Sequence, residues 1–252
     1  MKKLEAVVPF ETADGSMTLF DQERGIHYRS HHGAISESCH VFLGATGLLE
    51  QVGQWRVAEL GFGAAVNFTQ TVAAFRARPE VEELIYHTVD WRTVTPGHLS
   101  FHEGEGGELA RRLAAQIHED PGEVAKVISE DGAIVASLHP GAWEEVEVEE
   151  IEAQAFFHDP FSIRVNPEAW QKETFEWARR WMMETGRLAT YSAASAVKRA
   201  MLEAGFFVAT APGPGRKREI TVASPSEAGL VAMEGARLLE RSRYLPDENR
   251  EG

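Results

Sequence analysis

Hydrophobic and polar positions follow strand-like and helix-like patterns in turn along most of the chain. Residues 55–60 form a short strand pattern, residues 64–78 have the apolar spacing of a helix, and residues 83–90 form a second strand that ends in Asp90. A strand, a helix and another strand in this order predict a parallel βαβ unit with a right-handed crossover. This alternation predicts an α/β fold.

The same alternation continues to residue 223. The further predicted helices cover 107–119, 167–184 and 194–204, and the further predicted strands cover 133–138, 153–157, 187–191, 206–210 and 219–223. Pro167 suits the first turn of its helix, because that turn leaves amide hydrogens unpaired in any case. We expect residues 46–223 to form one main domain.

Both ends of the chain depart from this pattern. The opening, residues 1–45, has short strand patterns between turn residues, including residues 41–43, and predicts a small β-rich N-terminal extension. Residues 224–252 are polar and predict a single C-terminal helix with a frayed end. The expected organisation is a main domain with one appendage at each end.

Composition narrows the class of protein. The chain has 252 residues, 43% hydrophobic content and a formal net charge of −14, which disfavours nonspecific binding to nucleic acid. Cys39 is the sole cysteine, so no disulfide can form within the chain, and we expect a buried thiol. The histidines show no metal-site spacing, and we expect no metal. No segment is apolar over the about 18 residues that span a membrane, and the N-terminus lacks a signal pattern, so we expect a cytoplasmic protein with no membrane partner.

The turn after the first of these strands carries a glycine pattern, Glu59-Leu-Gly-Phe-Gly63. Glycines between a strand and a helix leave backbone amides free to approach a ligand closely. A dinucleotide fingerprint would place a third glycine where this chain has Val66. The Glu59 carboxylate would repel a pyrophosphate, but it suits the ammonium group of S-adenosylmethionine. The turn therefore favours S-adenosylmethionine over NAD, with an ordinary strand-to-helix turn as the alternative.

Two aspartates follow predicted strands at the edge where open α/β sheets bind ligands. Asp90 is placed to accept hydrogen bonds from ribose hydroxyls, unless it is only a solvated strand end. Asp159 follows strand 153–157 and is expected to face the reactive end of the cofactor, where a carboxylate can orient an amine or take its proton. The neighbouring His158 is expected to be structural.

A predicted hairpin, Pro212-Gly-Pro-Gly-Arg-Lys-Arg218, is the one compact basic segment of the sequence. Lys217 and Arg218 are therefore candidates for contacts with the phosphates of an RNA. A tight turn with solvated charges explains the same residues equally well.

Several motifs occur in a fixed order between residues 16 and 223. They are Tyr28-x-x-x-x-Gly33-Ala-x-x-Glu37-Ser38 with Val41-Phe-Leu43, Ala58-Glu-Leu-Gly-Phe-Gly63 with Asn67-Phe68, Phe157-His-Asp159 through Asn166-Pro-Glu-x-Trp170, Leu188-Ala-Thr-Tyr-Ser192, Ala204-Gly-Phe206 and Gly213-x-Gly-x-Lys-Arg-Glu219. Together they resemble the tRNA wobble-uridine methyltransferase family. That family comprises the methyltransferase domain of the bifunctional bacterial enzyme that makes 5-methylaminomethyl-2-thiouridine, and its stand-alone relatives.

The resemblance implies a class I Rossmann-like methyltransferase fold, with a mostly parallel seven-stranded sheet whose last strand is reversed. It also implies S-adenosylmethionine as the methyl donor and the aminomethyl group at position 5 of wobble uridine, in the anticodon region of tRNA, as the acceptor. The implied roles are Glu59, Gly61 and Gly63 at the methionine end of the cofactor, Asp90 at the ribose, Asp159 at the substrate amine, and Tyr28, Asn67 and Tyr191 in the pocket lining.

This chain departs from the family pattern in two places. Relatives tend to have Gly-Asp-Ala where it has Pro140-Gly-Ala142, so it lacks an acid that would help to fix the adenine. The loop after Asp159 also differs, at Pro160, Ile163 and Arg164. The alternatives are therefore a methyltransferase for a small amine or another nucleic acid, and a noncatalytic domain that binds a partner through acidic residues 144–152. The sequence contains no recognisable oxidase domain, so a tRNA substrate would need a separate enzyme to supply its aminomethyl precursor.

Overall fold

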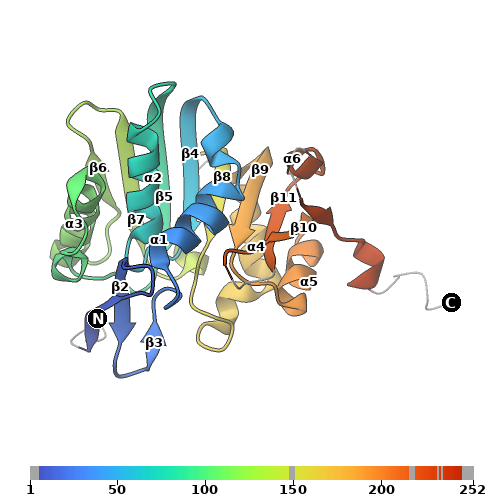
Figure 1. The fold of residues 1–252 in the computed structure, drawn as a ribbon, viewed down its shortest axis with the longest axis horizontal. Coiled ribbons are helices and arrows are strands. Elements are labelled where there is room, and N and C mark those ends of the chain that lie inside the picture. The colour runs from blue at the N-terminus through green and yellow to red at the C-terminus, as the bar shows by residue number, and fades with distance from the viewer. Residues whose placement is uncertain (1–5, 148–150, 216–218, 232, 234, 246–252) are drawn as a thin grey trace.

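A nine-stranded sheet in the order β12-β10-β11-β9-β8-β4-β5-β7-β6 forms the centre of the protein (Figure 1). The computed structural model describes residues 6–147, 151–215, 219–231, 233 and 235–245. The five central parallel strands are β4 (Gly53–Leu60), β5 (Val81–Asp90), β7 (Ile134–Pro140), β8 (Ala153–His158) and β9 (Met182–Thr190). Their carboxyl ends all meet at one edge of the sheet.

The strand β11 (Glu219–Ser224) is the reversed strand. It lies between β9 and β10 (Phe207–Pro212) and pairs antiparallel with both. Two further strands, β6 (Ala125–Ile128) and β12 (Arg237–Leu238), pair antiparallel with the outer strands β7 and β10. The predicted seven-stranded sheet with a reversed last strand is confirmed, and one strand is added at each edge.

Helices cover both faces of this sheet (Figure 1). The first layer contains α1 (Ala34–Glu37), the π-helix Ser38–Gly44, α2 (Val66–Arg76) and α3 (Gly104–Glu119), and the second contains α4 (Lys172–Arg180) and α5 (Ser195–Glu203). Successive side chains of a strand point to opposite faces of the sheet, so one strand packs against both layers. Val57 of β4 packs with the first layer, and Ala58 packs with the second. The remaining short helices are Leu48–Glu50, Pro96–Leu99, Trp143–Glu145, Pro167–Trp170, α6 (Ala228–Val231) and Arg241–Arg243.

The N-terminal extension forms a separate three-stranded antiparallel sheet of β1 (Val7–Glu11), β2 (Met17–Asp21) and β3 (Ile26–His27). A buried ion pair connects it to the main sheet: Arg92 Nη1, just beyond β5, lies 2.7 Å from Oδ2 of Asp21. The extension therefore meets the carboxyl edge of the central sheet.

Four local expectations are wrong. The helix predicted over 167–184 ends at Arg180, because the chain enters β9 at Met182 and pairs with β8. Residues 41–43 belong to the π-helix rather than to a strand, and Cys39 in the same helix is exposed instead of buried. The tail is not one helix, because part of it pairs with the free edge of β10 as β12.

Candidate functional site

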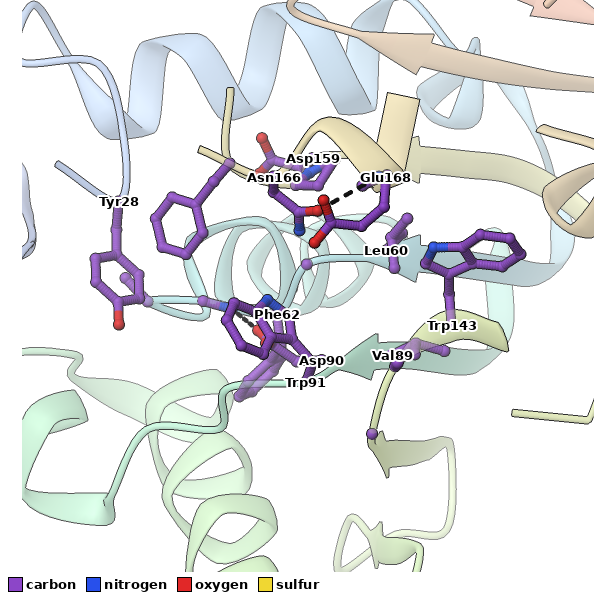
Figure 2. Close-up of a pocket in the computed structure, with 18 of the residues that line it drawn as sticks. Tyr28, Leu60, Phe62, Val89, Asp90, Trp91, Trp143, Asp159, Asn166 and Glu168 are labelled. Carbon is purple, nitrogen blue, oxygen red and sulfur yellow. Dashed lines mark hydrogen bonds between the residues drawn. The ribbon is translucent and has the colours of Figure 1, made fainter. Parts of the chain in front are cut away.

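A cavity opens at the carboxyl edge of the sheet, around the point between β4 and β8 where the strand order reverses (Figure 2). It holds about 870 Å³ of empty space, a volume that includes its open mouth. Its lining includes Tyr28, Arg29, Leu60, Gly61, Phe62, Gly63, Val89, Asp90, Trp91, Trp143, Glu144, Asp159, Phe161, Asn166 and Glu168. Figure 2 shows Asp90 and Asp159 on two sides of this space.

The glycine turn between β4 and α2 forms the floor of the cavity. Gly61 has φ +104°, and a Cβ atom there would lie 2.5 Å from the backbone oxygen of Asp159. Gly63 has φ +50°, and Ala65 adopts a left-handed conformation immediately before the helix. Only glycine fits position 61, both in its dihedral angle and in its space. The turn therefore holds bare backbone against the cavity, as the binding of a cofactor in close contact requires.

Asp90 lies at the end of β5 and is held by backbone donors. Its Oδ2 accepts the N–H of Gly63 at 2.7 Å, and its Oδ1 accepts the N–H of Arg92 at 2.8 Å. Burial raises the pKa of the carboxyl, although these hydrogen bonds oppose the shift. Because each carboxylate oxygen has two lone pairs, Asp90 can fix the glycine turn and still accept hydrogen bonds from a ligand.

Asp159 follows β8 on the other side of the cavity. Its backbone N–H donates to Leu60 O at 2.9 Å, and its Oδ2 receives both the Arg29 guanidinium and Asn67 Nδ2, the latter at 3.0 Å. Because both side chains bind Oδ2, Oδ1 is the oxygen available to a ligand. Burial raises the pKa of this carboxyl well above its ordinary value, against the opposing effect of Arg29.

Glu59 and Asn67 lie behind the cavity wall and not among its lining residues. Glu59 is 2% exposed, and burial raises the pKa of its carboxyl to about 7. Asn67 Nδ2 donates to Glu59 Oε1 at 2.9 Å as well as to Asp159, while Asn67 Oδ1 accepts the Ser38 hydroxyl at 2.7 Å. The amide of Asn67 thus connects the two acids instead of lining the cavity as expected.

The two predicted tyrosines have different positions. Tyr28 lines the cavity, and its ring meets the edge of Phe161 at 5.0 Å between centroids. Tyr191 is not among the lining residues; its hydroxyl donates to Pro160 O at 2.9 Å and supports the loop after Asp159. His158 is structural: it is buried, its ring hydrogen-bonds to Ala169 O at 2.8 Å, and burial lowers its pKa to about 3.

Several lining residues did not stand out in the sequence. Trp91 directly follows Asp90, and Trp143 follows the segment 140–142. The indoles of both residues line the cavity (Figure 2). Arg29 directly follows Tyr28 and reaches Asp159. Adjacency to Tyr28 and Asp90 was the available signal for these residues, but it does not reveal which way a side chain points.

Other predictions concern features away from the cavity. Lys217 and Arg218 lie outside the described residues, between the ends of β10 and β11. Within the described part of the chain, no helix is long and apolar enough to cross a membrane. No group of three or more metal-ligating side chains gathers there either.

The donor set fits S-adenosylmethionine. Gly61 and Gly63 present backbone at the floor, Asp90 offers acceptors for ribose hydroxyls, and the Trp91 and Trp143 rings suit the face of an adenine. The acidic side chains of the lining, Asp90, Glu144, Asp159 and Glu168, outnumber its one cation, Arg29, which already pairs with Asp159. This balance of charge agrees with a cofactor that carries an ammonium and a sulfonium.

Comparisons with known proteins agree with this fit. A family model described as S-adenosyl-L-methionine-dependent methyltransferase matches residues 105–226. The tRNA 5-methylaminomethyl-2-thiouridine biosynthesis bifunctional protein MnmC of Ralstonia nicotianae is 35% identical over 210 residues, which cover 78% of this chain and 31% of that protein. The protein of the same name from Cupriavidus necator is 34% identical over 205 residues, with the same coverage. The chain thus spans about a third of the length of these curated relatives.

A solved structure extends the match to the fold. The crystal structure of MNMC2 from Aquifex aeolicus superposes with a TM-score of 0.68 at 26% identity, covering 87% of this chain and 70% of that one. The chain thus matches this family in sequence and in structure. It also has the sheet order with a reversed strand, the glycine turn and an aspartate at the end of two strands. The chain belongs to the MnmC family of S-adenosyl-L-methionine-dependent methyltransferases.

Proposed function

We propose that this protein methylates the aminomethyl group at position 5 of wobble uridine in tRNA. The observation that carries the proposal is the Asp159 carboxylate, which lines the cavity beside the glycine turn with Oδ1 available to a ligand. The names of the MnmC relatives, which refer to 5-methylaminomethyl-2-thiouridine in tRNA, support an aminomethyl group as the acceptor.

Under this proposal, Gly61 and Gly63 hold the methionine end of the cofactor and Asp90 holds the ribose. Glu59 and Asn67 act from behind the wall, where they set the charge and position of Asp159. Tyr28 and Phe161 close the side nearest the extension, and Tyr191 fixes the loop after Asp159. S-adenosylmethionine supplies the electrophilic methyl group.

Asp159 positions the amine for in-line attack. Its Oδ1 accepts an N–H of the neutral amine, which aims the nitrogen lone pair into the cavity. The new N–C bond forms as the S–C bond breaks, and the nitrogen, which becomes positively charged, then loses one proton. A carboxylate beside that nitrogen stabilises the charge and can accept the proton. The protein therefore contributes orientation and electrostatics, not a covalent intermediate.

A tRNA substrate has further consequences for the cell. A separate enzyme would supply the aminomethyl precursor, and the protein would act in the cytoplasm, where tRNA is modified. Lys217 and Arg218, which lie between β10 and β11 in the sequence, would contact the tRNA backbone.

The direct test is transfer of labelled methyl from S-adenosylmethionine to tRNA from cells that lack this protein, followed by mass spectrometry of the nucleosides. Conversion of 5-aminomethyluridine to its methylated form is the expected result. Free 5-aminomethyluridine nucleoside serves as the matched small substrate. Faster methylation of the free nucleoside than of tRNA would support the small-amine alternative, and cofactor binding without any methylation would support the noncatalytic one.

The basic hairpin gives a second test of the RNA substrate. Lys217→Gln together with Arg218→Gln should weaken tRNA binding and lower the slope of log affinity against log salt by up to about 2. Cofactor affinity should stay unchanged, as measured by calorimetry. An unchanged salt slope would remove these residues from the RNA-binding surface.

A further inference from the structure

Arg29 brings a cation from the N-terminal extension into the cavity wall. Its side chain is 5% exposed and pairs with Oδ2 of Asp159, whose side chain is 7% exposed. The guanidinium carbon lies 5.2 Å from the centre of the Phe42 ring, which packs against it. Nη1 is buried and has no hydrogen-bond partner among the described residues. The cation is therefore fixed beside Asp159 by packing as well as by charge.

Acidic groups face this pair from several elements. Burial raises the pKa of the Asp159 carboxyl, Arg29 lowers it, and Glu37 of α1 and Glu59 of β4 raise it again. Two phenols, Tyr86 of β5 and Tyr191 beyond β9, also interact electrostatically with Asp159, and Glu168 lines the same cavity. Arg29 is the cation that faces these acids within the described part of the chain.

A carboxylate and an amine in contact can hold one extra proton between them. If the proton sits on the amine, the lone pair that attacks the methyl group is lost. If it sits on the carboxyl, the acceptor that orients the amine is lost. A site that methylates amines therefore has to keep this proton away at neutral pH.

We propose that Arg29 is a positioning residue that excludes the extra proton from the Asp159–amine pair, so that the substrate amine binds in its neutral, nucleophilic form. This inference rests on the proposed function. The positive charge of the guanidinium disfavours a second positive charge beside it. With Arg29 and Asn67 on Oδ2, the neutral amine donates to Oδ1. The N-terminal extension thereby supplies part of the active site.

The test compares Arg29→Gln, which removes the charge but keeps hydrogen-bond donors, with Arg29→Lys, which keeps the charge. The titration of Asp159 is followed by carbon NMR of protein labelled at the aspartate carboxyls, with the signal assigned by its loss in Asp159→Asn. The midpoint should rise by about 1–2 pH units in the Gln variant and stay within about half a unit in the Lys variant. Arg24→Gln, in the same extension and outside the cavity lining, is the matched control and should leave the midpoint unchanged.

Methyl transfer gives the second readout. The acid limb of the kcat/KM profile should move to higher pH in Arg29→Gln, so that a loss of about 10- to 100-fold at pH 7 is recovered as pH rises. A merely structural role would lower the rate equally at every pH.

Equal Asp159 midpoints in the Gln and Lys variants would overturn the inference. If Arg29→Gln does not fold, Arg29→Lys decides alone, and a midpoint shift above about one unit overturns it. Absence of methyl transfer to any amine by the unmodified protein would instead contradict the proposed function. The NMR titration would still test whether Arg29 controls the protonation of Asp159.

Discussion

The two aspartates of the cavity are held by different kinds of partner. Asp90 accepts backbone N–H groups from Gly63 and Arg92, which belong to the turns directly after β4 and β5. Asp159 is held by the side chains of Arg29 and Asn67, which come from the N-terminal extension and from α2. Backbone donors follow from the course of the chain, whereas side-chain donors require separate segments to meet.

This difference divides the cavity into two halves. The half around Asp90 and the glycine turn consists mainly of backbone groups and their hydrogen bonds, which suits it to binding a cofactor. The half around Asp159 is a buried charge cluster, suited to controlling an amine and its proton. Substitutions in the first half should therefore change cofactor affinity, and substitutions in the second should change the rate of methyl transfer.

Asp159→Asn should produce the largest effect. It removes the charged acceptor for the amine and leaves the buried Arg29 without its partner, so methyl transfer should fall by about 100-fold or more. Cofactor affinity, measured by calorimetry, should change by less than about threefold, because Asp90 and the glycine turn are untouched. Asp120→Asn, at the exposed end of α3, is the control. Near-normal single-turnover rates in Asp159→Asn would remove Asp159 from the mechanism.

Gly61→Ala should have the next largest effect. Alanine would have to adopt the φ of +104° that Gly61 has, and its Cβ would lie 2.5 Å from the backbone oxygen of Asp159, so the turn must move. We expect cofactor affinity to fall at least about tenfold and the free energy of unfolding to fall by about 1–3 kcal/mol. Gly122→Ala is the matched control, since an added Cβ there meets nothing within 4 Å. Calorimetry measures the cofactor affinity, and chemical unfolding measures the free energy of unfolding. Equal values for the two variants would contradict the role of the glycine turn in cofactor binding.

Asp90→Asn should have a smaller effect, confined to binding. An amide can accept at one atom only, so one of the backbone N–H groups of Gly63 and Arg92 loses its acceptor. Cofactor affinity should fall about tenfold, while the rate at saturating cofactor stays nearly constant. A drop in that saturated rate with unchanged affinity would mean that the division between the two halves is wrong.

Glu59→Gln should have the smallest effect, on the pH dependence of stability. Because burial raises the pKa of Glu59 from 4.5 to about 7, the folded protein binds more protons than the unfolded chain between these values. Its contribution is therefore most favourable below about pH 4.5 and is lost as pH rises to about 7. The free energy of unfolding should therefore fall between pH 5 and pH 7.5, and Glu59→Gln should reduce this fall by about 1–3 kcal/mol, as measured by urea unfolding at the two pH values. Glu82→Gln, at an exposed position of β5, is the control and should leave this fall in unfolding free energy unchanged. An equal fall in Glu59→Gln would contradict the raised pKa of Glu59 as its cause.

The sequence alone predicted the features that depend on local pattern. Periodicity identified the strands of the central sheet and most helices, and the Glu59-Leu-Gly-Phe-Gly63 turn marked the floor of the cavity. Asp90 and Asp159 were predictable as neighbours of that floor, because the carboxyl ends of parallel strands meet at one edge. For these residues, strand alternation, glycine conformation and sheet polarity are enough.

Only the tertiary structure decided which side chains meet. Arg29 lies far from Asp159 in sequence, and its place beside that carboxylate depends on how the small sheet docks against the main one. The same kind of long-range packing turned Asn67 away from the cavity and drew part of the tail into β12. Local pattern determines the course of the backbone, whereas contacts between distant segments depend on packing free energies that no short stretch of sequence contains.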